Sequence, residues 1–209
     1  MSETLFIHIH PQNPQERLIE QVAECLRNGG IIIYPTDTVY GIGCDIYNTR
    51  AIEKICRLKG LNPEKANLSF ICADLSHLSD FTTPFDRHVY RLMNGVLPGP
   101  YTFILRANNE VPKLLKSKKK TVGIRVPNNA ICRAIVGKLG HPIISTSLRI
   151  DSDISEYPTD PDEIFGLYAG QVEIIIEGGI GGTEPSTVVD CSTDTIEIVR
   201  QGKGHVDWE

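Results

Sequence analysis

The stretch that decides the fold is Gly30-Ile31-Ile32-Ile33-Tyr34-Pro35-Thr36-Asp37-Thr38-Val39-Tyr40-Gly41. Its β-branched run at residues 31–34 predicts a buried strand. Proline has no backbone N–H, so we expect the strand to end at Pro35. The hydroxyl side chains that follow lie where α/β sheets bind ligands, outside the carboxyl end of a strand. Taken alone, the segment is equally compatible with a ligand site and with a polar turn.

Three further clusters rich in glycine, serine, threonine or proline favour a ligand site. They lie at residues 98–102, 145–147 and 178–187, and each adjoins an apolar run typical of a strand. Glycine lets backbone N–H groups approach an anion closely, and hydroxyl groups add donors. The four clusters together therefore indicate one shared anion-binding crevice. The sequence contains neither a Walker phosphate loop nor a G-x-G-x-x-G motif after a strand.

The composition is that of an ordinary globular protein. A chain of 209 residues with a formal net charge of −5 fits a single domain over residues 1–209. No apolar run approaches the roughly 20 residues that span a bilayer, and the N-terminus does not resemble a signal peptide. The six cysteines stand singly, without a C-x-x-C pair. We therefore expect reduced core thiols, a cytoplasmic location and no membrane partner.

Charge is distributed unevenly along the chain. Residues 113–133 carry seven basic side chains and no acidic one, whereas residues 151–163 carry acidic side chains and no basic one. A local basic patch can bind phosphates even when the total charge is negative. The candidate residues for binding RNA are Lys116, Lys118, Lys119 and Lys120. The alternative is a solvated lysine loop, which is the commoner role of such a run.

Apolar periodicity predicts helices that alternate with strands, hence an α/β domain. The expected helices begin near Asn13, Asn48 or Thr49, Thr83, Asn128 or Asn129, and Asp160. The expected strands are residues 31–34, 68–72, 101–105, 121–126, 142–145, 172–176, 187–190 and 195–200. Short connections, such as the one between Val189 and Ile196, imply antiparallel pairs in a mixed sheet. Residues 202–209 are expected to form a surface tail.

The histidines do not suggest a metal site. His8 and His10 alternate along an apolar segment, with no third ligand near them in sequence. They are therefore interpreted as surface or edge residues, and no tightly bound metal is expected. A hydrolase is also unsupported, because no serine, histidine and aspartate occur in the order of a nucleophile-elbow enzyme.

Several motifs, in fixed order between Leu18 and Lys203, resemble those of the YrdC/YciO family. They are residues 34–41 (YPTDTVYG), 57–60 (RLKG), 98–102 (PGPYT), 123–127 (GIRVP), 145–147 (STS), 185–190 (PSTVVD) and 199–202 (VRQG). The resemblance implies a twisted mixed α/β sheet with flanking helices and a concave face. It also implies the activity of threonylcarbamoyl-AMP synthases, which use L-threonine, bicarbonate and Mg²⁺–ATP to make an adenylate for tRNA modification.

The resemblance assigns roles to individual residues. Lys59 and Arg125 are the expected catalytic residues, because displacement at a phosphorus centre needs positioning and charge neutralisation more than a strong base. For Arg125 the alternative is a structural salt bridge at a strand end. The remaining expected contacts are Thr36, Tyr40 and Ser186 for threonine, and Ser145, Ser147 and Arg200 for ATP or AMP.

Two departures from the synthase motifs make the chain resemble the YciO branch more closely. The synthases share a Lys-x-Arg motif, and here Leu61 stands at the arginine position. They also share a Ser-x-Asn motif, and here Arg149 stands at the asparagine position. Arg149 is a further nucleotide-binding candidate, because it could replace the missing charge; alternatively it pairs with Asp151 or Asp153. Two functions therefore remain: a threonylcarbamoyl-AMP synthase, or a YciO-type protein that binds double-stranded RNA or tRNA and has no synthase activity.

Overall fold

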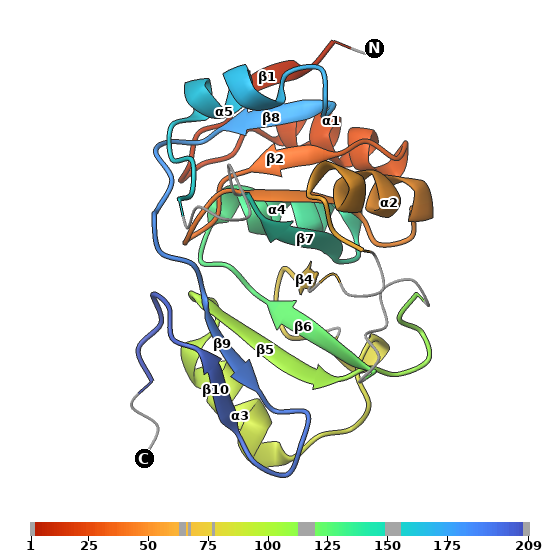
Figure 1. Cartoon of the computed structure of the whole chain (residues 1–209), viewed down its shortest axis with the longest axis vertical. Coiled ribbons are helices and arrows are strands. Elements are labelled where there is room, and N and C mark those ends of the chain that lie inside the picture. Colours follow the sequence, from red (N-terminus) through yellow and green to blue (C-terminus); the bar gives the residue numbers. More distant parts are fainter. Residues whose placement is uncertain are drawn as a thin grey trace.

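The strands form one mixed sheet, as the alternation of strands and helices predicted (Figure 1). The computed structural model describes residues 3–62, 66, 68–76, 78–112, 120–148 and 156–206. Within them, ten strands are ordered β1-β8-β2-β3-β7-β4-β6-β5-β9-β10 across the sheet. The pairs β1/β8, β2/β8, β4/β6 and β5/β9 are parallel, and the other neighbours are antiparallel.

The elements have the following bounds. The strands are β1 (Leu5–His8), β2 (Ile32–Tyr34), β3 (Gly41–Asp45), β4 (Ser69–Ile71), β5 (Tyr101–Arg106), β6 (Thr121–Arg125), β7 (Ile143–Ser147), β8 (Ile174–Glu177), β9 (Thr187–Asp190) and β10 (Glu197–Arg200). The helices are α1 (Glu16–Arg27), α2 (Thr49–Leu58), α3 (Arg87–Val96), α4 (Ala130–Leu139) and α5 (Pro161–Tyr168), with a 3-10 turn at Leu78–Asp80.

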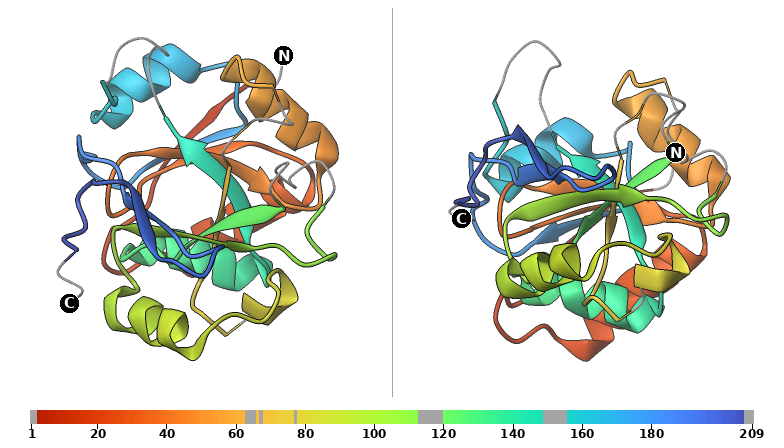
Figure 2. Two further views of the ribbon diagram at one scale, coloured as in Figure 1. Left: turned by 60° about the horizontal axis from the view of Figure 1, so that its bottom comes forward. Right: turned by 90° about the horizontal axis from the view of Figure 1, so that it is seen from below.

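Helices cover the two faces of the sheet unequally. On one face α1 and α4 pack against strand residues such as Ile71 and Ile143. The larger apolar cluster includes residues of α2, α3 and α5. In both views of Figure 2, α2 and α5 lie toward the top of the twisted sheet, and α1, α3 and α4 lie toward the bottom. Side chains alternate along a strand, and Ile124 and Phe103 belong to the larger cluster. Their neighbours Arg125 and Thr102 therefore point to the opposite side of the strands from Ile124 and Phe103.

Two helices begin later than predicted. Gln15, not Asn13, is the N-cap of α1, and the backbone N–H of Asn13 instead donates to His10 Nδ1 at 3.1 Å. Helix α3 begins after Asp86, whose carboxylate accepts the N–H of His88. Thr83 cannot start this helix, because its N–H is bonded to the carbonyl of Arg106 at 2.9 Å. In both places, contacts with other parts of the chain replace the expected cap.

The sequence analysis missed strand β3, although all of its residues are buried. Two of the five are glycines, which are poor strand formers when considered alone. Their role appears only in the sheet. A Cβ at Gly43 would lie 2.7 Å from the carbonyl oxygen of Ile144, and one at Gly41 would lie 3.1 Å from the ring of Tyr34. Glycine thus lets the Tyr34 ring lie over β3.

Residues 202–209 were expected to form a surface tail, but residues 202–205 are hydrogen-bonded to the sheet and only partly exposed. The Thr187 hydroxyl donates to the carbonyl of Gly204 at 2.6 Å, and the Tyr101 hydroxyl donates to that of His205 at 2.7 Å. Gly202 and Gly204 are buried. Small residues and hydroxyl groups, rather than an apolar stripe, attach this segment to the sheet, so hydrophobic periodicity does not reveal it.

The predictions for His8 and for the cysteines agree with the structure. His8 lies on β1, at one edge of the sheet, and is therefore an edge residue as predicted. Its side chain pairs with Glu177. All six cysteines are free thiols, and all but Cys25 are buried. Among the described residues, no helix has the length and apolar character that crossing a membrane requires.

Candidate functional site

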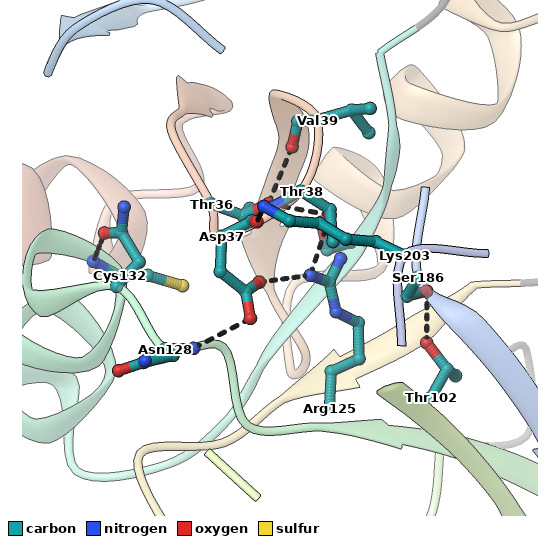
Figure 3. A network of polar contacts seen from close by, with 12 residues as sticks. Thr36, Asp37, Thr38, Val39, Thr102, Arg125, Asn128, Cys132, Ser186 and Lys203 are labelled. Carbon is teal, nitrogen blue, oxygen red and sulfur yellow. Dashed lines mark hydrogen bonds and ion pairs between the residues drawn. The ribbon is translucent and has the colours of Figure 1, made fainter. Parts of the chain in front are cut away.

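The loop between β2 and β3 is held in shape by its own threonines (Figure 3). The Thr36 hydroxyl accepts the backbone N–H of Thr38 at 3.0 Å and donates to the carbonyl of Val39 at 2.7 Å. The two threonine hydroxyl oxygens lie 3.1 Å apart. A side-chain hydroxyl that bonds to nearby backbone N–H and carbonyl groups in this way stabilises a turn. The loop is therefore rigid, with Thr36 partly accessible and Thr38 buried.

Arg125, at the end of β6, is bound to this loop. Its Nη2 donates to Asp37 Oδ1 at 2.8 Å and to the Thr38 hydroxyl at 3.0 Å. The other carboxylate oxygen of Asp37 accepts the N–H of Asn128 at 3.0 Å, just before α4. Both side chains of the ion pair are only 9% exposed. The salt bridge that was the alternative interpretation of Arg125 is thus present.

The ion pair does not satisfy the whole guanidinium group. Nε of Arg125 is buried and has no hydrogen-bond partner among the described residues. Buried donors without a partner are rare in folded proteins and are costly. Arg125 therefore combines a fixed orientation with unused donor capacity, which is the state expected of a residue that receives an anionic ligand.

Ser186, just before β9, forms a second group of polar contacts beside the first. Its hydroxyl lies 2.9 Å from that of Thr102, which is opposite Arg125 in the continued β5/β6 register. Arg200, at the end of β10, donates from Nη2 to the Ser186 carbonyl at 2.7 Å and to its hydroxyl at 3.3 Å. The predicted residues Arg125, Ser186 and Arg200 are thus brought to one region of the sheet from three strands.

The glycine-rich segment after β8 closes against the same loop. Tyr40 donates its hydroxyl to the carbonyl of Gly179 at 2.7 Å, and Gly182 donates its N–H to the carbonyl of Thr38 at 2.8 Å. A Cβ at Gly182 would lie only 2.3 Å from that oxygen, so this approach requires glycine. Burial raises the pKa of Tyr40 to about 12. Tyr40 is therefore a neutral hydrogen-bonding residue near pH 7 and not a base.

Ser145 and Ser147 lie on β7, next to the glycines of β3. The Ser145 hydroxyl accepts a hydrogen bond from the buried Tyr34 hydroxyl at 2.6 Å and donates to the carbonyl of Ile42 at 3.3 Å. Ser147 is paired with Gly41 and is partly exposed. Together with the contacts above, this pairing joins all four polar clusters of the sequence into one continuous structure.

The structure describes only some of the remaining predicted residues. Lys59 is the partly exposed C-cap of α2. Lys120 is exposed and has a left-handed backbone conformation, with φ of 53°. The predictions for Arg149, Lys116, Lys118 and Lys119 fall outside the described residues. Their proposed roles in nucleotide and RNA binding stay predictions.

Two residues of the site were not predicted to function there. Asp37 lies in the quoted strand-end motif, and its position between two threonines marks it as part of the turn. Lys203 follows the VRQG motif and was counted with the surface tail. Its Nζ donates to the backbone carbonyl of Asp37 at 2.6 Å. No local pattern signals this contact, because the two residues are 166 positions apart.

The side chains of the site favour anion binding over proton transfer. Within the described part of the chain, no group of histidine, cysteine, aspartate or glutamate residues could hold a metal ion. Cys132 lies nearby at the start of α4, but burial raises the pKa of its thiol to about 12, so it is not a thiolate. The groups that converge are the guanidiniums of Arg125 and Arg200, the Lys203 ammonium, the Asp37 carboxylate and several hydroxyls. They can orient and neutralise a carboxylate or phosphate.

The sequence matches one family of proteins. A family profile, Sua5/YciO/YrdC, described as "Telomere recombination", matches residues 24–202. The chain is 47% identical to the uncharacterized protein YciO of Escherichia coli K12 over 203 residues, 96% of this chain and 97% of that protein. It is 30% identical to a threonylcarbamoyl-AMP synthase of Methylobacillus flagellatus over 171 residues, 82% of this chain and 93% of the synthase.

Solved structures show the same relationship. The crystal structure of E. coli YciO superimposes with a TM-score of 0.92 at 44% identity, covering 98% of both chains. P. abyssi Sua5 complexed with L-threonine gives a TM-score of 0.87 at 26% identity, covering 95% of this chain and 58% of that one. The greater similarity to YciO agrees with the departures at Leu61 and Arg149. The chain belongs to the Sua5/YciO/YrdC family, on the side of YciO.

Proposed function

We propose that this chain binds L-threonine and ATP at the Arg125 site and makes threonylcarbamoyl-AMP. The observation that carries the proposal is the buried Arg125 guanidinium, which Asp37 and Thr38 orient while its Nε stays without a partner among the described residues. A planar guanidinium suits a carboxylate, because it presents several donors in a fixed geometry. The relationship to a synthase and to a Sua5 structure with L-threonine supports the choice of ligand.

The residues suit the chemistry of such a reaction. The threonine amine and bicarbonate give a carbamate and water, and a carbamate oxygen then attacks the α-phosphorus of ATP. The bond from that phosphorus to the bridging oxygen breaks, and pyrophosphate leaves with Mg²⁺. This displacement needs alignment and neutralised charge rather than a strong base. The hydroxyls of Thr36, Tyr40 and Ser186, together with Arg125 and Lys59, would hold threonine and the reacting carboxylate. Ser145, Ser147, Arg149 and Arg200 would lie at the nucleotide.

The experiment is a turnover assay on the whole chain with L-threonine, bicarbonate, Mg²⁺ and α-labelled ATP. We expect a labelled adenylate and pyrophosphate in equal amounts. We also expect at least about tenfold less of both when either threonine or bicarbonate is omitted. ATP turnover that is independent of threonine would contradict the proposal.

The second candidate function has its own readout. If no adenylate forms and duplex RNA binds with an affinity that falls steeply as salt rises, the YciO-type RNA-binding function is favoured instead. The described part of the chain carries no observation that favours RNA over a small ligand, since most of the lysine run lies outside it.

A further inference from the structure

Lys203 combines a fixed backbone with a side chain that ends in a single described contact. Its backbone N–H donates to the carbonyl of Pro185 at 2.9 Å, and the N–H of Gly202 donates to the Thr187 hydroxyl at 3.0 Å. A Cβ at Gly202 would lie 2.3 Å from the Pro185 oxygen, so the chain is pressed against the start of β9. The backbone of Lys203 is therefore anchored, and the exposed side chain extends from it toward the Asp37 loop.

The contact that Lys203 makes does not neutralise its positive charge. Its ammonium donates to the backbone carbonyl of Asp37, a neutral acceptor. The carboxylate of Asp37 is already engaged by Arg125 and by the N–H of Asn128. Arg125 and Lys203 thus both contact Asp37, the first at its carboxylate and the second at its backbone carbonyl. The Lys203 ammonium thus makes no described contact with a carboxylate, and it lies at the loop that carries the partly accessible Thr36.

We propose that Lys203 is a phosphate-binding residue of this site. It would exchange the carbonyl of Asp37 for a phosphate oxygen of the nucleotide or of pyrophosphate. A hydrogen bond between an ammonium and a phosphate is stronger than one to a neutral carbonyl, and the flexible lysine stem permits the exchange without movement of the backbone. The inference rests on the proposed function for the identity of the ligand. It would also supply positive charge in a chain that has Leu61 where synthases have an arginine.

The test is calorimetric titration of Mg²⁺–ATP into four proteins in the presence of L-threonine: the parent, Lys203→Ala, Lys203→Arg and Lys54→Ala. Lys54 is the matched control, because it is a partly exposed lysine on α2 that pairs with Glu173 away from the Asp37 loop. We expect Lys203→Ala to weaken ATP binding at least about tenfold, or about 1.4 kcal/mol. We expect Lys203→Arg and Lys54→Ala to stay close to the parent.

A second titration with adenosine separates charge from packing. Adenosine has no phosphate, so its affinity should be the same for the parent and Lys203→Ala. Equal ATP affinities for these two proteins would overturn the inference and leave the proposed function standing. Binding of ATP that depends on Lys203 without release of pyrophosphate would support the inference and contradict the proposed function. A parent that binds no ATP would overturn both.

Discussion

Replacing Asp37 with alanine is expected to lower the free energy of unfolding by about 3–5 kcal/mol. The substitution removes the only charged partner described for Arg125, whose side chain is 9% exposed. A buried guanidinium without a counter-charge costs far more than the intact pair contributes. The change also removes the acceptor for the N–H of Asn128, at the entry to α4. Denaturant unfolding measured by circular dichroism checks this value.

Two further variants show whether the charge is the cause. Asp37→Asn keeps the shape and one acceptor oxygen. It should therefore lower the free energy of unfolding substantially, but by less than Asp37→Ala does. The double variant Asp37→Ala with Arg125→Met removes both charges, and we expect it to recover most of the lost stability. A loss below about 1 kcal/mol in Asp37→Ala would mean that water already solvates this guanidinium.

Replacing Arg125 with alanine is expected to lower the rate of adenylate formation at subsaturating threonine at least about 100-fold, or about 2.7 kcal/mol. The reason is the proposed contact between this guanidinium and the bound threonine. Arg125→Lys keeps the charge but loses the planar fork, so it should recover only part of the rate. The initial rate of pyrophosphate release, at a temperature where all variants are folded, is the measurement.

The control for this prediction is Arg133→Ala. Arg133 is an exposed arginine on α4, and its Nε donates to the carbonyl of Ala73. It carries the same charge and lies on the helix that begins beside Asp37, but it makes no contact with the loop between β2 and β3. Its rate should stay within about twofold of the parent. If Arg125→Ala and Arg133→Ala lowered the rate equally, only the general charge of this region would matter.

The mixed sheet and the meeting of the four polar clusters could be predicted because their signals are local. Apolar runs that end at proline or glycine indicate strands such as β2, and the hydroxyl groups after them indicate where a ligand is expected. Strand β3 was missed for the opposite reason. Its glycines are explained by the ring of Tyr34 and the backbone of Ile144, which approach from other strands.

The same difference between local signals and long-range contacts applies to the residues of the site. Arg125 and Thr36 could be expected in one region of the sheet, because each lies in a motif at a strand end, and their roles in ligand binding stay predictions. The partners Asp37 and Lys203 could not be joined from the sequence, since 166 positions separate them and one of the bonded atoms belongs to the backbone. Every residue has a backbone carbonyl, so the sequence does not show which of them accepts a hydrogen bond. Residues whose role depends on such an acceptor become visible only when the fold is known.

The most direct test of the central claim is a crystal structure of this chain grown with a saturating concentration of L-threonine. We expect the threonine carboxylate within hydrogen-bond distance of the Arg125 guanidinium, about 2.7–3.2 Å, with the Thr36 and Ser186 hydroxyls also contacting the ligand. The claim would be contradicted if threonine bound elsewhere on the chain, or were absent while Arg125 kept only its contacts with Asp37 and Thr38.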